Sequence, residues 1–342
     1  MRPLHGHGPA VGVAALVGGA SAPARPHYPR RVPGTPPTRY AYLGPEGTFA
    51  EAALISAVAP DEGARRPAAG VPAALAAVRS RGADAALVPL ENSVEGSVPA
   101  TMDGLADGDP LLITREVFLT VSFVLAGRPG TTLSDVRSVA SHPHALAQTA
   151  DTVARLLPGV VPLPATSTAE AARQVAAGEH DAAVCAPIAA ERYGLTALAD
   201  DVADHPGAVT RFVLVAPPGP LPAPTGNDKT SLVAVVGDRT GALLDLLREF
   251  AVREISLTRI ESRPTRERLG VYSFSLDCEG HVADARVGEA LAALHRVCDE
   301  LRFLGSYPRA DGRENKPVTP VSTDAAFGEA AGWLERVRAG QV

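Results

Sequence analysis

The sequence has little of what marks secreted, metal-binding, nucleic-acid-binding or membrane-spanning proteins. Its three cysteines, Cys185, Cys278 and Cys298, are an odd number without paired spacing, which argues against a disulfide framework or a zinc site and for a reducing compartment. No run approaches the ~20 apolar residues of a membrane span. A net charge of -6, with only two lysines, provides no basic surface for nucleic acid. We therefore expect a cytoplasmic protein that binds neither nucleic acid nor membrane and has no metal site.

The first 38 residues do not have the pattern of a folded domain. A short apolar run at residues 11–17, followed by small residues at 21–24, resembles a secretory signal. Against that interpretation, the run is Gly-rich, and residues 25–39 are rich in Pro and Arg without periodicity. We interpret residues 1–38 as a disordered N-terminal tail, with export as the open alternative.

A repeated design organises the next part of the chain. A helical pattern at residues 71–81 precedes Asp-Ala-Ala and an apolar strand at 84–89, and a helical pattern at 167–177 precedes the same arrangement at 181–187. At 342 residues the chain is long enough for two or three folded units. We predict two α/β lobes over residues 39–216, the plan of a hinged small-molecule binder.

A dense polar turn follows the strand of the first copy. Glu91, Asn92 and Ser93 lie between the apolar run that ends at Val88 and a helical pattern that begins at Pro99. In open α/β folds, ligands bind where the carboxyl end of a strand meets free helix N–H groups. The alternative is that Asn92 and Ser93 are ordinary turn and capping residues.

Further polar residues occupy the ends of other predicted elements. Ser141 and Gln148 are seven residues apart and would share one helix face, whereas Ser167 and Thr168 have the pattern of a capping box and need do no more than cap. Arg211 could bind a carboxylate through two parallel hydrogen bonds, or be a surface residue at a strand start. A turn containing Gly44, Gly47 and Thr48 lets backbone N–H groups approach an anion, although such turns are also common without a ligand.

The pattern changes after a Pro-rich linker at residues 217–228. Residues 229–309 have the order βαββαβ, which is the ferredoxin-like arrangement. In the third strand Tyr272, Phe274 and Leu276 alternate with Ser273 and Ser275, so we expect one buried and one polar face. Residues 310–342 are predicted to form a C-terminal tail, polar first and then weakly helical.

Together these segments resemble the prephenate dehydratase family over residues 40 to about 309. The resemblance rests on Tyr42-Leu43-Gly44-Pro45-Glu46-Gly47-Thr48-Phe49, Pro89-Leu90-Glu91-Asn92-Ser93, Gly96-Ser97-Val98, Ser141-His142-Pro143, Thr210-Arg211-Phe212 and Ile260-Glu261-Ser262-Arg263-Pro264. It implies a two-lobed catalytic region like type II periplasmic binding proteins, then an ACT domain that binds L-phenylalanine. The implied reaction converts prephenate to phenylpyruvate in L-phenylalanine biosynthesis and uses no cofactor. Residues 1–38 are too short and irregular for a chorismate mutase unit, so a monofunctional enzyme is expected.

The resemblance also implies roles for residues. Thr210 would donate a hydrogen bond to the leaving hydroxyl, and Arg211 would anchor a substrate carboxylate. Glu91 could supply a proton only if burial raises its pKa. The remaining catalytic and lining candidates are Asn92, Ser141, Gln148, Phe212, Ser93, Ser167, Thr168, Gly44, Gly47 and Thr48.

The implied effector site usually forms between two ACT domains, so a homodimer or homotetramer is expected. Its residues here are Gly241, Ala242, Leu243, Ser256, Glu261, Ser262, Arg263 and Pro264. The chain departs from the family where Glu254-Ile255-Ser256 replaces Gly-(Val/Ile)-Asn, so inhibition by L-phenylalanine is less secure than catalysis. His144, where a Gln is common, is a milder departure. Two other functions stay open: an arogenate dehydratase and a non-catalytic amino-acid sensor.

Overall fold

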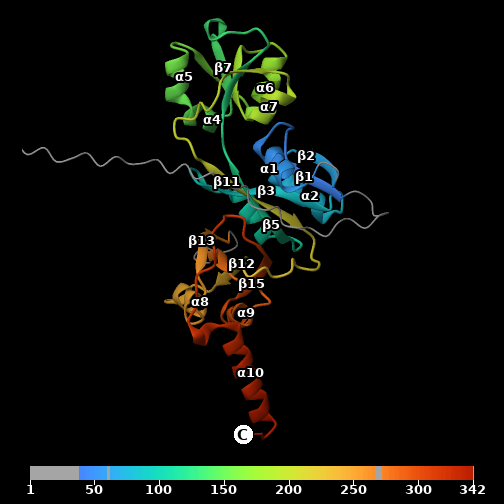
Figure 1. The fold of residues 1–342 in the computed structure, drawn as a ribbon, viewed down its shortest axis with the longest axis vertical. Helices are drawn as coiled ribbons and strands as arrows, with labels where there is room; N and C mark the ends of the chain where they lie inside the picture. Colours follow the sequence, from blue (N-terminus) through green and yellow to red (C-terminus); the bar gives the residue numbers. More distant parts are fainter. Residues whose placement is uncertain (1–37, 60–61, 266–271, 342) are drawn as a thin grey trace, which may run out of the picture. The chain divides into compact units, whose positions relative to one another are not determined.

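The computed structural model describes residues 38–59, 62–265 and 272–341 (Figure 1). The first sheet has the strand order β2-β1-β3-β11-β5, and the short β4 pairs with β3. Its strands are β1 (Thr38–Leu43), β2 (Gly63–Ala68), β3 (Ala85–Asn92), β4 (Gly96–Ser97), β5 (Leu112–Thr120) and β11 (Val209–Ala216). β1 runs parallel to β2 and β3, whereas β11 runs antiparallel to β3 and β5. The sheet therefore combines an early α/β unit with two strands from later in the chain.

Helices cover the two faces of this sheet differently. One face packs on α1 (Phe49–Ala57) through the cluster that includes Leu54 and Phe212. The other face packs on α2 (Val71–Arg79) and α3 (Pro99–Ala106) through the cluster that includes Leu75 and Met102. The uninterrupted apolar run of β3 follows from this arrangement, since both of its faces are buried.

The second sheet has the order β10-β6-β9-β7-β8. Its strands are β6 (Val124–Gly127), β7 (Ser138–Ser141), β8 (Val161–Pro164), β9 (Ala182–Cys185) and β10 (Thr196–Ala199), and its helices are α4 (Pro143–Gln148), α5 (Ala150–Leu156), α6 (Thr168–Ala176) and α7 (Pro187–Arg192), with the short η1 (Leu133–Asp135) before β7. The repeated design thus places α2 and β3 in one lobe and α6 and β9 in the other. The predicted pair of α/β lobes is confirmed. The segments that join them lie side by side, because the N–H of Val121 donates to the carbonyl of Ala208 at 2.7 Å.

The third unit is the predicted βαββαβ fold. Its elements are β12 (Asp228–Val236), α8 (Ala242–Ala251), β13 (Leu257–Pro264), β14 (Tyr272–Glu279), α9 (Ala285–Val297) and β15 (Glu300–Pro308), in the sheet order β13-β14-β12-β15. One sheet face packs on α8 and α9 through Leu246, Phe250, Leu276 and Leu294. After it come η2 (Pro320–Ser322) and α10 (Asp324–Arg338).

The other face of the third sheet is buried as well. Ser275 is 5% exposed and Asp277 is fully buried. Val233 and Tyr307 of this sheet belong to the same apolar cluster as Leu90 of the first lobe. The polar face expected from strand alternation is thus present, but it packs against the first sheet and does not face solvent. The alternation of side chains along a strand shows which face is polar but not whether that face is exposed to solvent. Here the polar face is covered by residues from a distant part of the chain.

The cysteines lie inside packed segments. Burial raises the pKa of Cys185 and Cys278 to about 12, and that of Cys298 to about 11. We expect all three thiols of the native protein to react with a disulfide reagent at pH 8 roughly 100-fold or more slowly than in denaturant, because the thiolate is the reacting species. Following thiol release in both conditions tests this; equal rates would contradict it.

None of the helices in the described ranges combines the length and apolar character needed to cross a membrane.

Candidate active site

Thr210 and Asn92 meet where β11 pairs with β3. The Asn92 Nδ2 atom donates a hydrogen bond to Thr210 Oγ1 at 2.8 Å. Asn92 Oδ1 accepts from the backbone N–H groups of Val94 at 2.8 Å and Glu95 at 3.1 Å, which fixes the orientation of the amide. Since Asn92 uses an acceptor position of the Thr210 hydroxyl, the hydroxyl hydrogen can be donated to another molecule. The structure therefore brings the two predicted residues together, and the turn fixes which of them donates the hydrogen bond.

Ser93 fastens the polar turn to the start of β11. Its N–H donates to the carbonyl of Val209 at 2.9 Å, and the N–H of Val209 donates to Ser93 Oγ, also at 2.9 Å. Both polar groups of Ser93 are used within the protein. The residue thus holds the turn beside Thr210.

Arg211 points to the opposite face of β11 from Thr210. Thr210 lies two residues before Phe212, which belongs to the cluster on the α1 side of the sheet. Arg211 lies two residues before Val213, which belongs to the cluster on the α2 and α3 side. This follows from the two-residue period of a strand, in which neighbours point to opposite faces. Strand alternation thus separates two residues that the sequence interpretation placed in one site.

The Arg211 guanidinium is buried among four polar partners. It is 2% exposed. Its Nη1 donates to Glu91 Oε1 at 2.9 Å and to Asp277 Oδ2 at 2.6 Å, its Nη2 donates to Tyr307 Oη at 2.9 Å, and its Nε lies 2.9 Å from Glu116 Oε2. This arrangement does not fit the expected carboxylate anchor, because a substrate carboxylate would have to displace these partners. Glu91 is likewise engaged as the partner of Arg211.

Two other predicted residues lie within the core. Phe212 is 3% exposed and packs with Leu54 and Leu214. Ser141 is fully buried, and its Oγ donates to the carbonyl of Val184 at 2.6 Å. Both side chains are buried and support the lobes from inside.

The glycine turn uses its own polar groups. The N–H of Gly47, at φ +86°, donates to Glu51 Oε2 at 2.5 Å, and Thr48 Oγ1 donates to the carbonyl of Leu43 at 2.8 Å. The N–H of Gly44 donates to the carbonyl of Ala68. These groups are therefore not available to an anion in this arrangement. Glu51 in turn forms an ion pair with Arg192 of the second lobe.

Glu95, which the sequence interpretation left out, links the lobes on another side. Gln148 Nε2 donates to Glu95 Oε1 at 2.8 Å, and His144 Nδ1 lies 2.8 Å from Glu95 Oε2. The signal was present, because Glu95 lies in the same polar turn as Asn92. Ser167 caps α6 by accepting from the N–H of Glu170 at 2.9 Å, and Thr168 is the first residue of that helix.

The expected effector residues fall on two elements of the third unit. Gly241, at φ +84°, precedes α8, and Ala242 and Leu243 begin that helix. On β13 the side chains alternate: Glu261 and Arg263 are half-buried, whereas Ser262 and Pro264 are exposed. Arg263 Nε lies 2.8 Å from Asp103 Oδ1 of α3, so one side of this motif contacts the first lobe.

The Glu254 departure has a structural counterpart. Glu254 has φ +52°, a left-handed conformation that favours Gly. Its carboxylate accepts hydrogen bonds from the N–H of Thr319 at 2.8 Å and from Thr319 Oγ1 at 2.6 Å, and these bonds lower the pKa of Glu254. Ser256 lies two residues beyond it, and its carbonyl accepts from the N–H of Glu279. The added carboxylate therefore holds the C-terminal tail.

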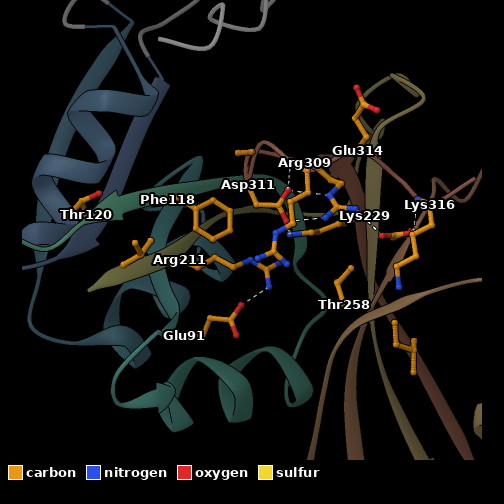
Figure 2. A pocket seen from close by; sticks show the side chains of 15 residues that line it. Glu91, Phe118, Thr120, Arg211, Lys229, Thr258, Arg309, Asp311, Glu314 and Lys316 are labelled. Atoms are coloured by element: carbon orange, nitrogen blue, oxygen red, sulfur yellow. Dashed lines mark hydrogen bonds and ion pairs between the residues drawn. The ribbon is translucent and has the colours of Figure 1, made fainter. Parts of the chain in front are cut away.

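A cavity of about 670 Å³ adjoins the Arg211 network (Figure 2). Lys229 is 3% exposed, and its Nζ atom lies 3.1 Å from Glu116 Oε2 and 3.0 Å from Asp311 Oδ2. The wall is formed by Glu91, Phe118, Thr120, Val209, Arg211, Lys229, Leu257, Thr258, Glu279, Arg309, Ala310, Asp311, Arg313, Glu314 and Lys316. The cavity thus lies between the first sheet, the third sheet and the segment that follows β15.

Comparisons with known proteins follow the same division of the chain. A family model described as prephenate dehydratase matches residues 40–219, and an ACT domain model matches residues 230–296. The prephenate dehydratase of Mycobacterium tuberculosis (strain ATCC 25618 / H37Rv) is 51% identical over 311 residues, which are 89% of this chain and 95% of that protein.

Solved structures are similar over most of the chain. The prephenate dehydratase of Arthrobacter aurescens in complex with L-Phe is 46% identical, with a TM-score of 0.83, over 88% of this chain and 99% of its own. GqqA, described as a novel type of quorum quenching acylase, is 31% identical, with a TM-score of 0.73, over 80% of this chain and 98% of its own.

Proposed function

The chain belongs to the prephenate dehydratase family, and on that premise we propose that Thr210 and Asn92 form the centre at which it converts prephenate into phenylpyruvate. The activity and its control by L-phenylalanine follow from the family model over residues 40–219, the ACT domain, and a relative whose structure holds L-Phe. The observation that carries the residue assignment is the hydrogen bond from Asn92 to Thr210.

The reaction needs positioning more than strong acid chemistry. Prephenate loses its ring carboxylate as carbon dioxide, the electrons of that bond complete the aromatic ring, and the ring hydroxyl leaves and takes up one proton to become water. A donor aimed at the leaving oxygen stabilises the charge that develops there. Thr210 is a poor Brønsted acid, so it acts as that hydrogen-bond donor and not as the proton source. Holding the substrate in a reactive geometry supplies the rest of the rate enhancement.

The substrate's side-chain carboxylate requires a partner other than Arg211. We assign its binding to the second lobe, to the N-terminal end of α6 at Ser167 and Thr168 and to the Gln148 amide, which must exchange its hydrogen bond with Glu95 for one with the substrate. Helix N-termini favour anions because their N–H groups lack intrahelical partners. The two lobes then hold opposite ends of one substrate, which is the use expected of a hinged α/β pair.

Asn92→Asp tests the polarity of the Thr210 hydroxyl. The substitution keeps the size and the acceptor of the turn but removes the donor, so the Thr210 hydrogen turns toward the new carboxylate. We expect kcat to fall about 10- to 100-fold, the range of one misdirected donor. Steady-state kinetics with prephenate measure this. Asn227→Asp, whose Nδ2 donates to the carbonyl of Arg313 at 3.0 Å away from Thr210, is the matched control; equal kcat values in the two variants would refute the assignment.

The activity itself is tested by phenylpyruvate formation from prephenate, with and without L-phenylalanine, using the purified full chain. We expect turnover that L-phenylalanine suppresses. Turnover of arogenate in preference to prephenate would make the enzyme an arogenate dehydratase. Binding without turnover of either compound would make it a sensor.

We also propose the assembly and location that the family suggests. Residues 39–216 form the catalytic region and residues 229–309 the ACT domain, joined by the linker at 217–228. The enzyme assembles as a homodimer or homotetramer through its ACT domains and works in the cytoplasm. Light scattering coupled to size-exclusion chromatography measures the assembly, and a monomer in the presence of L-phenylalanine would contradict it.

A further inference from the structure

The partners of Arg211 come from two different sheets. Glu91 and Glu116 belong to β3 and β5 of the first sheet, whereas Asp277 and Tyr307 belong to β14 and β15 of the ACT sheet. A single side chain on the catalytic strand therefore bridges the catalytic region and the regulatory domain. Since a guanidinium offers five N–H donors in a rigid plane, a shift of any partner changes the direction of the whole group.

The ACT partners of Arg211 are themselves held firmly. Asp277 is fully buried, and its Oδ1 accepts from Ser231 Oγ at 2.6 Å. Complete burial by itself raises the pKa of Asp277, but the charges of Arg259 and Arg211 keep that pKa well below its usual range. The same Ser231 Oγ lies 2.5 Å from Tyr307 Oη. Asp277 and Tyr307 thus form one hydrogen-bonded acceptor pair on the ACT sheet, which moves with that sheet.

Arg211 is joined to Thr210 by the backbone of a single strand. The pairing of β11 with β3 shifts register between Arg211 and Phe212, so the regular ladder is interrupted next to the two residues. A change in the position of Arg211 is therefore passed to Thr210 on the other face of the strand. A misplacement of about 1 Å at a reacting group can cost on the order of 10²-fold in rate.

The cavity beside Arg211 leaves space for a second arrangement of this network. Close-packed cores resist small shifts because every displacement meets another atom. Here Glu91, Arg211 and Lys229 all line a cavity of about 670 Å³ (Figure 2). The network can rearrange into this space without an overlap in the core.

From these observations we infer that Arg211 is a positioning residue through which the ACT domain sets the placement of Thr210. Asp277 and Tyr307 hold the guanidinium, the guanidinium holds β11, and β11 presents the Thr210 hydroxyl. A change in the ACT sheet on effector binding thereby alters the alignment of the catalytic donor. This role rests on the proposed function of Thr210 and replaces the expected role of Arg211 as an anchor of substrate.

Tyr307→Phe tests the inference with the smallest change in the network. It removes the acceptor of the Arg211 Nη2 bond and keeps the ring in place. We expect kcat to fall about 3- to 10-fold with KM for prephenate within twofold, and the concentration of L-phenylalanine for half-inhibition to rise at least about threefold. Both effects follow because the strand that bears Thr210 is held less tightly by the ACT sheet.

Ser306→Ala is the matched control. Ser306 is the neighbour of Tyr307 on β15 but bonds on the other sheet face, to Thr230 Oγ1 at 2.7 Å and the N–H of Val282 at 3.0 Å. Ser306 and Tyr307 are both fully buried, so we expect the two substitutions to lower the stability of the protein by similar amounts. Thermal unfolding of both variants measures this. We expect its kcat and its response to L-phenylalanine to equal those of the unmodified enzyme.

The outcomes separate this inference from the function on which it rests. If Tyr307→Phe and Ser306→Ala have equal kcat values, or respond equally to L-phenylalanine, Arg211 does not transmit the state of the ACT domain and the inference is wrong. Asp277→Asn, which removes the charge next to Arg211, should change both quantities further in the direction of Tyr307→Phe. Absence of turnover in the unmodified enzyme would instead overturn the proposed function, and the inference with it.

Discussion

Replacing Thr210 with alanine should lower kcat by about 10²- to 10³-fold while KM for prephenate changes little. Loss of one donor aimed at a developing negative charge typically has an effect of this size. Substrate affinity depends mainly on the carboxylate contacts assigned to the second lobe, so it survives the substitution. The measurement is steady-state phenylpyruvate formation over a range of prephenate concentrations.

Two further substitutions at Thr210 separate its hydroxyl from its shape. Thr210→Ser keeps the hydroxyl that accepts from Asn92 and should retain activity within about tenfold of the unmodified enzyme. Thr210→Val keeps the branched shape without the hydroxyl and should be as impaired as Thr210→Ala. Normal turnover in the valine variant would remove Thr210 from the mechanism.

Glu116→Gln should destabilise the protein by about 3–5 kcal/mol, the typical cost of breaking a buried ion pair. The Glu116 carboxylate lies 2.9 Å from Arg211 Nε and 3.1 Å from Lys229 Nζ, and it accepts from the N–H of Ala310 at 2.7 Å. Glutamine keeps the shape but leaves two buried cations without their shared anion. Thermal unfolding measures the loss, and a decrease in Tm of about 6 °C or more corresponds to it.

Glu170→Gln is the matched control for this effect. Its carboxylate pairs with Arg173 at 2.7 Å on the exposed face of α6, where the Arg173 side chain is about half exposed. Exposed pairs of this kind contribute about 0–1 kcal/mol, because water solvates and screens both charges. A Glu116→Gln protein that unfolds at the same temperature as Glu170→Gln would show that the network around Arg211 contributes no net stability.

Local patterns in the sequence were sufficient for the architecture. The apolar Asp-Ala-Ala segments at residues 84–89 and 181–187, each preceded by a helix, predicted two α/β lobes, because a strand buried on both faces needs a continuous apolar run. The order βαββαβ after the Pro-rich linker predicted the third unit in the same way. The meeting of Asn92 and Thr210 was expected only through the family resemblance, since 118 residues separate them.

The faces of the sheets were partly accessible from sequence. Strand alternation places Thr210 and Arg211 on opposite sides of β11, and applying that rule would have separated the two roles. The same rule placed Ser273 and Ser275 on the polar side of β14, and Asp277 continues this alternation. It could not tell that this side is covered, because the surface that covers it comes from residues such as Leu90 and Met102, far away in the chain.

The sequence by itself determined the elements and their order, because these depend on local periodicity, and its short motifs, through the family they resemble, directed attention to Thr210. Only the tertiary structure decided what Arg211 contacts. Its four partners come from strands up to 120 residues before it and up to 96 residues after it, and a charge can remain buried only where such partners converge. That convergence depends on how two sheets pack, and no local pattern in the chain encodes it.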